Sequence, residues 1–531
     1  MRTIPQKPFR PVVLVVLDGL GVSSISTSPL YQVKRPTISS LEKFFPFTTL
    51  QASGIAVGLP WGEEGNSEVG HLTIGSGRVI YHHLPKISVS IQDGSFFENE
   101  AFLKAAEQVV KYASALHLMG LFSSGSVHAY PDHLYALLEF AKQKGVERVF
   151  LHLFSDGRDS PREEAGTFFQ ELELRIAKNY PFARISSVVG RDWAMDRDGN
   201  WGKIERVYNL LVRRTGRAFQ RASTYLAAQY QEGVTDEFIE PGYLEGEQGG
   251  AVGRVGNNDA VIFFNFRGDS ARELSRAFVQ EGFDKFPRQA LQNLLFVAMT
   301  EYEEGFPFLI AFPPLGVSWP LAEVIAEANL AQLHVAETEK YAHVTYFFNG
   351  GRERPYPGEE RILIPSLPGA KFDEHPEMSA DKVTNTTIAN FSKYDFILVN
   401  YANADMVGHT GDFDATVKAL EVLDGCLGKI LEKVLATEGA LLITGDHGNA
   451  EEKRYPLSGE KKTKHTANAV PFYLAAKEFK RAQERSPEEI FAGYNKVEGV
   501  LTDVAPTILK LMGLPIPAEM TGVNLLARIV E

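Results

Sequence analysis

Short apolar runs rich in β-branched residues recur along this chain, and several of them lead directly into a carboxylate or an imidazole. PVVLVVL is followed by Asp18, YDFILVNYANADMVGH carries Asp405 and His409, and ALLITGDHGN carries Asp446 and His447. This pattern is typical of a buried strand followed by a polar loop, as in α/β proteins with largely parallel sheets. Because the carboxyl ends of parallel strands meet at one edge of a sheet, we expect these five side chains to share one site.

A second series of strand ends differs in chemistry, because three of its four members carry arginine and the fourth carries histidine. Four runs between about residue 115 and residue 270 belong to it, namely VERVFLHLFSDGRD with Arg158 and Asp159, ARISSVVGRD with Arg191, DAVIFFNFRGD with Arg267, and ALHLMGLFSSGSVH with His128. One arginine followed by aspartate is most simply a local ion pair that caps the next helix. Three such pairs in one region, with Arg197 nearby in MDRD, favour the binding of an anion.

The two series occupy different parts of the chain, which predicts two domains. The carboxylate and histidine ends fall before residue 75 or after residue 400, and 531 residues exceed what one hydrophobic core usually holds. We predict a metal-binding α/β domain of residues 1–81 and 317–531, interrupted by an arginine-bearing α/β domain of residues 82–316. Glycine and proline clusters mark the two crossings, IGSGRVIYHH and IAFPPLGVSWP.

Composition excludes several classes of function. A net charge of -13 disfavours nucleic acid and anionic membrane as partners, because both need a basic surface. No apolar run approaches the roughly 18 residues of a membrane span, and VVLVVL is too short for a signal sequence. The single cysteine, Cys426, cannot form an intrachain disulfide, and we expect it buried on a helix that covers residues 414–432. These features predict a cytoplasmic protein.

Ser67 lies in GNSEVGH, between a glycine-rich stretch and a histidine. The stretch does not match the G-x-S-x-G pattern of serine hydrolases. Taken alone, it is most simply a turn in which Asn66 and Ser67 bond their own backbone. A nearby metal ion could instead activate the hydroxyl by lowering its pKa.

The ligands for such an ion are available at the predicted strand ends. Asp18 alone would be an ordinary turn residue, but it is joined by the D-x-x-x-H pair at Asp405, by Asp446 with His447, and by His465 in KKTKHTAN. Oxygen and imidazole ligands without sulfur suit Mn²⁺, Zn²⁺, Co²⁺ or Mg²⁺. Two ions in a phosphoryl-transfer site typically lie about 3.5 to 4 Å apart.

Taken together, these motifs resemble one family nearly end to end. The matching stretches occur in the family's order and are LDGLG, GNSEVGHLTIGSGR, GSVHAY, SDGRDSP, GRDWAMDRD, NFRGD, ETEKYAHVTYFFNGG, PEMSA, NADMVGHTGD, TGDHGNAE and HTANAVPF. The chain resembles the cofactor-independent phosphoglycerate mutases, members of the alkaline phosphatase superfamily. The resemblance implies an alkaline-phosphatase-like metal domain with an inserted transferase domain that binds the substrate.

The resemblance also implies a role for individual residues. One metal ion would be held by Asp18, Ser67, Asp446 and His447, and the other by Asp405, His409 and His465. Ser67 would be the nucleophile that becomes a phosphoserine. The phosphoglycerate would be bound by His128, Arg158, Asp159, Arg191, Arg197, Arg267 and, from ETEKY, Lys340.

As a relative of these enzymes, the chain would be an isomerase that interconverts 3-phosphoglycerate and 2-phosphoglycerate in glycolysis and gluconeogenesis. It would use two divalent ions, with Mn²⁺ favoured over Mg²⁺, Co²⁺ or Zn²⁺, and no 2,3-bisphosphoglycerate, and it would be a monomer. Two alternatives stay open. A metal-dependent phosphatase, or a mutase for another small phosphorylated metabolite, would share the metal ligands without the arginine set, and a non-catalytic relative would fail to bind metal.

One position departs from the family pattern. The family usually continues its arginine motif as N-F-R-x-D-R, whereas this chain reads NFRGDSARE, so Ser270 stands where a second substrate arginine is expected. Arg272 lies two residues further on, which rotates a helical side chain by roughly 200°. Arg272 could replace the missing group only if the local backbone differs.

Overall fold

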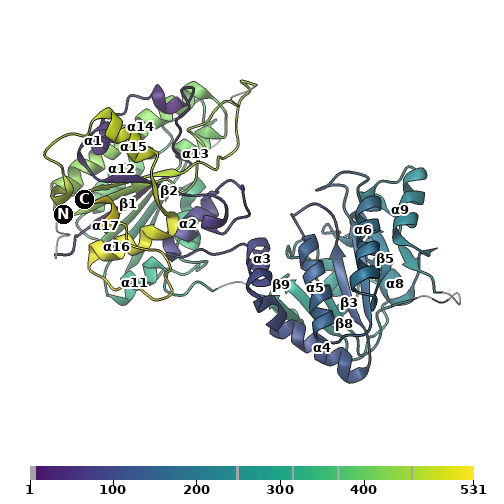
Figure 1. The fold of residues 1–531 in the computed structure, drawn as a ribbon. Coiled ribbons are helices and arrows are strands. Elements are labelled where there is room, and N and C mark those ends of the chain that lie inside the picture. The colour runs from purple at the N-terminus through teal and green to yellow at the C-terminus, as the bar shows by residue number, and fades with distance from the viewer. Residues whose placement is uncertain are drawn as a thin grey trace. The chain divides into compact units, whose positions relative to one another are not determined.

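The computed structural model of the protein describes residues 7–246, 250, 252–313, 316–367, 371–455 and 458–530. The chain divides into two compact units. Unit 1 comprises Met1–Tyr81 and Leu315–Glu531, and unit 2 comprises His82–Pro314. Each unit is an α/β structure with its own mostly parallel sheet, so the predicted fold class is confirmed (Figure 1). Within the described ranges, no helix is long and apolar enough to cross a membrane.

The sheet of unit 1 has eight strands and is parallel through its centre. The order across it is β12 (Glu359–Ile364), β11 (Gln332–Glu337), β13 (Phe396–Tyr401), β1 (Val12–Leu17), β14 (Ala440–Thr444), β15 (Val470–Ala475), β2 (Phe47–Gln51) and β16 (Val497–Val500). The five strands from β12 to β14 run parallel, and β15 is antiparallel to both of its neighbours. The central strand β1 therefore lies between β13 and β14, the other two strands predicted to bear ligands.

Both faces of this sheet are buried, which explains the unbroken apolar sequence of β1. Val12, Leu14 and Val16 face one hydrophobic cluster, and the alternate residues of the strand face another. The first cluster includes side chains of α2 (Ser67–Ser76), α11 (Leu321–Glu327), α16 (Val504–Met512) and α17 (Leu526–Ile529). The second includes side chains of α1 (Pro36–Phe44), α12 (Ala380–Asn390) and α14 (Phe413–Leu435). Unit 1 also contains α13 (Asn403–Gly408) and α15 (Pro487–Tyr494).

Helix α14 confirms the helix expected over residues 414–432. The side chain of Asp412 caps its first turn by accepting a hydrogen bond from the backbone N–H of Ala415, at 2.9 Å. Cys426 is buried on this helix, as predicted.

Unit 2 also has eight strands. Their order is β10 (Leu309–Phe312), β9 (Leu295–Thr300), β8 (Ala260–Phe263), β3 (Leu116–Leu121), β4 (Val149–Ser155), β5 (Ala183–Gly190), β7 (Gly242–Leu244) and β6 (Arg217–Phe219). All neighbours are parallel except β5 and β7. The helices are α3 (His83–Asp93), α4 (Glu100–Tyr112), α5 (Pro131–Gln143), α6 (Ala165–Asn179), α7 (Arg191–Ala194), α8 (Trp201–Arg213), α9 (Ala222–Gln231) and α10 (Arg272–Val279).

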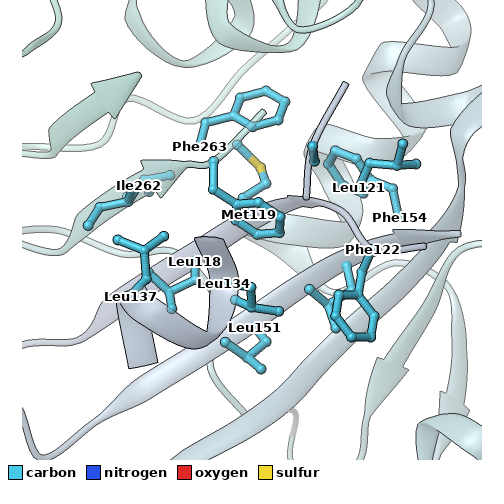
Figure 2. Packing of buried hydrophobic residues seen from close by; sticks show 14 of the residues in the cluster. Leu118, Met119, Leu121, Phe122, Leu134, Leu137, Leu151, Phe154, Ile262 and Phe263 are labelled. Atoms are coloured by element: carbon cyan, nitrogen blue, oxygen red, sulfur yellow. The ribbon is translucent and has the colours of Figure 1, made fainter. Parts of the chain in front are cut away.

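The core of unit 2 forms where strands β3, β4 and β8 meet the helices that cover them. Figure 2 shows Leu118 of β3 beside Leu134 and Leu137 of α5, and Leu121 of β3 beside Phe154 of β4. Leu151 of β4 and Ile262 of β8 belong to the same cluster. A chain of polar groups also crosses this interior. Its members are Asp259, His117, His152 and Ser187, linked in that order by hydrogen bonds of 3.1, 2.9 and 2.8 Å.

Short helical turns complete both units. The 3-10 turns are Pro29–Tyr31, Gly54–Val57, Ser95–Glu98, Asp236–Phe238, Thr338–Lys340, Lys477–Phe479 and Leu501–Asp503, and His343–Phe347 is a π-helical turn. The sequence SPREEAGTFF predicts a helix that starts at Ser160 and Pro161, and this prediction is wrong. Helix α6 begins at Ala165, where the carboxylate of Asp236 accepts hydrogen bonds from two backbone N–H groups, those of Glu164 and Ala165.

Candidate functional site

The predicted ligand positions of unit 1 come together at the carboxyl ends of adjacent strands. Asp18 directly follows β1, Asp446 lies two residues beyond β14, and Asp405 lies on α13 just after β13. Because β13, β1 and β14 are neighbours in that order, their three polar ends meet, as expected. Ser67 is the first residue of α2 and lies against the same edge.

The hydroxyl of Ser67 lies at the centre of this group. Its Oγ donates to Asp18 Oδ1 at 3.0 Å and lies 3.0 Å from Nε2 of His447. Asn66 precedes the helix, and its side chain accepts a hydrogen bond from the backbone N–H of Val69. Ser67 is therefore held at a helix N-terminus, where the helix dipole favours negative charge.

Lys340 bridges the two parts of the site. Its Nζ donates to Asp18 Oδ1 at 2.6 Å, to Ser67 Oγ at 2.7 Å and to Asp405 Oδ2 at 2.6 Å, so all three of its protons have an acceptor. Burial alone would lower the pKa of Lys340, but the two carboxylates more than offset this and raise it. Burial likewise opposes ionisation of Asp18 and Asp405, yet Lys340 holds the pKa of both well below the usual range.

Asp405, His409 and His465 form a cluster with the geometry of a metal-ligand set. Nε2 of each histidine lies 3.3 Å from Asp405 Oδ1, and the two Nε2 atoms lie 3.1 Å apart. The Nδ1 atoms are occupied, because they donate to the backbone carbonyls of Thr463 and Gly65. The Nε2 lone pairs therefore point to a shared position beside a carboxylate oxygen, an arrangement that fits a divalent ion.

The second predicted ligand set, Asp18, Ser67, Asp446 and His447, also lies together, with Nε2 of His447 at 3.5 Å from Asp18 Oδ1 and 3.7 Å from Asp446 Oδ2. Oδ1 of Asp446 accepts hydrogen bonds from the backbone N–H groups of Gly19 and His447, both at 3.0 Å. Oδ2 of Asp446 is buried and accepts no hydrogen bond within the described residues, although Nδ1 of His71 lies 3.1 Å away. A buried carboxylate oxygen without a partner is costly unless a cation completes its surroundings, so this group also fits a divalent ion.

His447 carries the clearest electrostatic signature of the site. Burial by itself lowers the pKa of its imidazole, but the carboxylates of Asp446, Asp18 and Asp405 outweigh burial and raise the pKa to about 9. The hydrogen bond to Asp405 raises the pKa of His409 in the same direction. Both imidazoles therefore lie in a strongly negative environment that attracts cations.

Sequence reasoning missed two residues that support this site. Nδ1 of His71 donates to the backbone carbonyl of Ser67 at 2.8 Å and lies 3.1 Å from Asp446 Oδ2. The side-chain amide of Asn400 donates to Asp18 Oδ2 at 2.8 Å and to Nε2 of His71 at 3.0 Å. The spacing of four residues between Ser67 and His71 was the available signal, because it places both on one face of α2.

The arginine-bearing ends of unit 2 surround a polar cavity of about 290 Å³. The predicted residues that line it are His128, Arg158, Asp159, Arg191, Arg197 and Arg267. Arg191 is buried and donates to Asp156 and Asp159, both at 2.6 Å. Arg197 and Arg267 share a single carboxylate, that of Asp269, at 2.9 and 3.2 Å.

His128 is neutral at pH 7 in this cavity. Burial, reinforced by the charge of Arg191, lowers the pKa of its imidazole to about 4. Arg191 can only donate, so its contact of 3.1 Å with Nε2 places the proton of His128 on Nδ1. Nδ1 lies 3.8 Å from a carboxylate oxygen of Asp269 and has no hydrogen-bond partner within the described residues.

Ser270 lines the cavity, whereas Arg272 is not among the residues that line it. Arg272 is the first residue of α10, and its Nε donates to the backbone carbonyl of Tyr302 at 3.1 Å. The carboxylate of Glu303 lies 3.4 Å from the same nitrogen. The guanidinium of Arg272 is therefore engaged outside the cavity and does not take the place of the missing arginine.

Comparison with known proteins identifies the family. The model of the Metalloenzyme superfamily matches residues 10–516. The 2,3-bisphosphoglycerate-independent phosphoglycerate mutase of Moorella thermoacetica is 46% identical over 521 residues, which cover 98% of this chain and 99% of the relative. This chain belongs to the family of 2,3-bisphosphoglycerate-independent phosphoglycerate mutases. The enzyme is therefore an isomerase, and the resemblance drawn from its motifs is confirmed.

Further relatives agree with this assignment. The corresponding mutase of Clostridium novyi is 45% identical over 520 residues, covering 97% of this chain and 99% of the relative. A crystal structure of the Leishmania mexicana phosphoglycerate mutase at low cobalt concentration has 30% sequence identity and a TM-score of 0.56, with 98% of both chains covered. The similarity thus extends over both units of the enzyme.

Proposed function

We propose that the enzyme interconverts 3-phosphoglycerate and 2-phosphoglycerate, in glycolysis and gluconeogenesis, through a phosphoserine formed on Ser67. Unit 1 would be the metal-binding, phosphatase-like domain, and unit 2 the substrate-binding transferase domain. The observation that carries the proposal is the position of the Ser67 hydroxyl. It contacts Asp18 and His447 of one ligand group and the buried ammonium of Lys340, and this ammonium also donates to Asp405 of the other group.

Two divalent ions would complete unit 1. Asp18, Ser67, Asp446 and His447 would hold one, and Asp405, His409 and His465 the other. Oxygen and imidazole donors fit Mn²⁺, which we favour, and also Mg²⁺, Co²⁺ or Zn²⁺. When bound, the ions would lower the pKa of the Ser67 hydroxyl and neutralise charge on the phosphoryl oxygens.

The chain's own groups would orient the nucleophile and receive charge. Asp18 fixes the direction of the Ser67 O–H bond by accepting from it, and Lys340 donates a hydrogen bond to the oxygen that would develop negative charge. Ser67 begins α2, so a phosphoryl group on it would also lie at a helix N-terminus.

Unit 2 would make the enzyme a mutase rather than a phosphatase. A mutase must retain the glycerate while the phosphoserine exists, so that the other hydroxyl of the glycerate can attack. The arginines at positions 158, 191, 197 and 267 can bind carboxylate and phosphate groups through paired N–H donors. Asp159 and His128 are the candidates for moving protons there, and the neutral state of His128 at pH 7 is compatible with such a role.

The alternative is a metal-dependent phosphatase, or a mutase for another small phosphorylated metabolite. The cavity lined by four arginines in unit 2 favours the phosphoglycerate mutase, because simple hydrolysis does not require a second anion site. A monomeric state, a cytoplasmic location and the absence of nucleic-acid and membrane partners stay predictions from the sequence.

Phosphorus NMR of the purified enzyme with Mn²⁺ and 3-phosphoglycerate, without added bisphosphoglycerate, tests the proposal. We expect 2-phosphoglycerate to accumulate without free phosphate. Free phosphate alone would mean that the phosphoserine forms but the glycerate escapes, which would make the enzyme a phosphatase. No conversion of 3-phosphoglycerate in the presence of bound metal would refute the proposed substrate.

A further inference from the structure

The cavity of unit 2 has a position at which the family's second arginine is replaced by a much smaller side chain. Ser270 is 4% exposed and lines the cavity, and its backbone N–H donates to Asp269 Oδ1 at 2.8 Å. Arg272 is engaged by the carbonyl of Tyr302 and the carboxylate of Glu303. An anion bound beside Ser270 must therefore find its positive charge elsewhere.

Lys203 lines the same cavity and has donors to offer. It lies in the first turn of α8, and its Nζ donates to Asp192 Oδ2 at 2.8 Å. An ammonium carries three N–H groups, so this contact leaves two of them for a ligand. The side chain of Lys203 is 31% exposed, which allows an incoming anion to reach it.

Lys203 and Ser270 lie near the starts of two helices that pack against each other. Helix α8 contacts α10. The backbone N–H of Gly199, just before α8, also donates to Glu273 Oε1 in the first turn of α10, at 3.0 Å. This hydrogen bond links the N-termini of the two helices. Lys203 from one helix start and Ser270 from the other line the same cavity.

The other cations that line this cavity are also paired with carboxylates, and Arg197 and Arg267 share that of Asp269. Arg191 faces two carboxylates, those of Asp156 and Asp159, and Arg158 pairs with Glu237. A phosphoglycerate carries both a carboxylate and a phosphate, and the chain as a whole is negative, so the cavity must concentrate cations locally. Lys203 is a further cation that can serve this purpose.

We propose that Lys203 and Ser270 together form the anion subsite for which the family's motif provides a second arginine. Ser270 supplies room and a hydroxyl, and Lys203 supplies the charge. This inference rests on the proposed function, because it takes phosphoglycerate as the ligand. A lysine acts as a point charge, whereas an arginine binds a carboxylate or phosphate through two parallel N–H groups.

The test is a rescue experiment with the metal-loaded full chain. Lys203→Met keeps most of the aliphatic stem and removes the charge. It should raise KM for 3-phosphoglycerate about tenfold to a hundredfold and change kcat by less than about threefold, because a charge-assisted contact made throughout the reaction is lost. Adding Ser270→Arg to that variant should restore KM to within about threefold of the wild type. Arg206→Met is the control, because Arg206 lies on the same helix but pairs with Glu240 and does not line the cavity.

Asp192→Asn separates binding from a purely structural role. It breaks the same ion pair but leaves the ammonium in place, so KM should stay unchanged or fall. The inference is overturned if Lys203→Met leaves KM unaltered. It is equally overturned if Asp192→Asn raises KM as Lys203→Met does and Ser270→Arg does not restore KM. In that case the role of Lys203 would be only to stabilise the position of α8.

Calorimetric binding of 3-phosphoglycerate distinguishes this inference from the proposed function. If the wild type binds 3-phosphoglycerate without converting it, the proposed function fails. The subsite is still tested by the dissociation constants of the wild type, Lys203→Met and the double variant, which should follow the pattern expected for KM. Equal dissociation constants in all three would refute it.

Discussion

Binding of a divalent ion should release a proton from His447. The imidazole is fully buried among the carboxylates of Asp18, Asp405 and Asp446, which raise its pKa to about 9 despite the opposing effect of burial. A histidine must be neutral to bind a metal ion. In the metal-free protein at pH 7, His447 is therefore a cation that an incoming metal ion has to deprotonate.

The size of the effect follows from the pKa. A pH of 7 is about two units below the pKa of His447, so the imidazole is almost fully protonated. Close to one proton should therefore leave for each ion bound at this position. Competition between the proton and the metal ion for His447 should weaken metal affinity about a hundredfold at pH 7, or about 2.7 kcal/mol. The metal affinity should then rise about tenfold per pH unit up to pH 9. Other ligands, His409 included, can add to the release.

The stability of the metal-free protein should change in the opposite direction. The folded-state pKa of His447 is above its ordinary value of 6.5, so the contribution of this group to stability is complete below pH 6.5 and is lost as the pH rises through 9. The free energy of unfolding should fall by about 3 kcal/mol between pH 6.5 and pH 9. Saturation with metal should remove this dependence.

Titration calorimetry of the metal-free protein with Mn²⁺ can measure the release. The titration is repeated at several pH values between about 7 and 8.5, in two buffers that differ in ionisation enthalpy. Proton release makes the observed heat depend on the buffer. His375→Gln, which changes an exposed histidine far from the ligands in sequence, should leave the result unaltered. Heats that do not depend on the buffer, with an affinity that is flat over this range, would refute the reasoning.

Three further predictions concern other parts of the enzyme. Ser67→Ala should abolish turnover yet leave Mn²⁺ binding measurable by calorimetry, because the other ligands stay in place; substantial mutase activity would exclude the phosphoserine. In Gly70→Ala the new Cβ would lie 2.6 Å from the carbonyl oxygen of Asp446, so the helix must move away and Mn²⁺ affinity should fall at least about tenfold. Gly425→Ala, in the open middle of α14, should instead raise the free energy of unfolding by about 0.5 to 1 kcal/mol in urea denaturation. Equal effects of the two substitutions on Mn²⁺ affinity and on the free energy of unfolding would contradict this account. Asp259→Asn should destabilise unit 2 by about 1 to 3 kcal/mol, because it breaks the buried chain of histidines, while Mn²⁺ binding is unchanged.

Much of the candidate metal site could be predicted because the residues proposed as ligands follow strands that are easy to recognise. A run such as VVLVVL has few alternatives to a buried strand, and the parallel arrangement of such strands brings Asp18, Asp405 and Asp446 together at one edge of the sheet. The pattern also separated the carboxylate ends from the arginine ends.

Contacts between residues distant in sequence could not be predicted. The start of α6 was misplaced because its cap is Asp236, about seventy residues away, rather than the local Ser160. Lys340 is buried among three acceptors because the 3-10 turn Thr338–Lys340 lies close to Asp18 and to Asp405 of α13. No local sequence pattern predicts this contact. The engagement of Arg272 by Tyr302 is likewise visible only in three dimensions.

The position of β1 has a consequence for synthesis of the chain. Val12 pairs with Phe396 on one side and with Ala440 on the other, so the first strand to leave the ribosome has no neighbours until most of the protein has been made. The strands of unit 2, by contrast, all lie within one continuous segment. We therefore expect unit 2 to fold first. Until β13 and β14 have been synthesised, the segment VVLVVL would stay exposed and prone to aggregation, so it is a suitable substrate for chaperones that bind nascent chains.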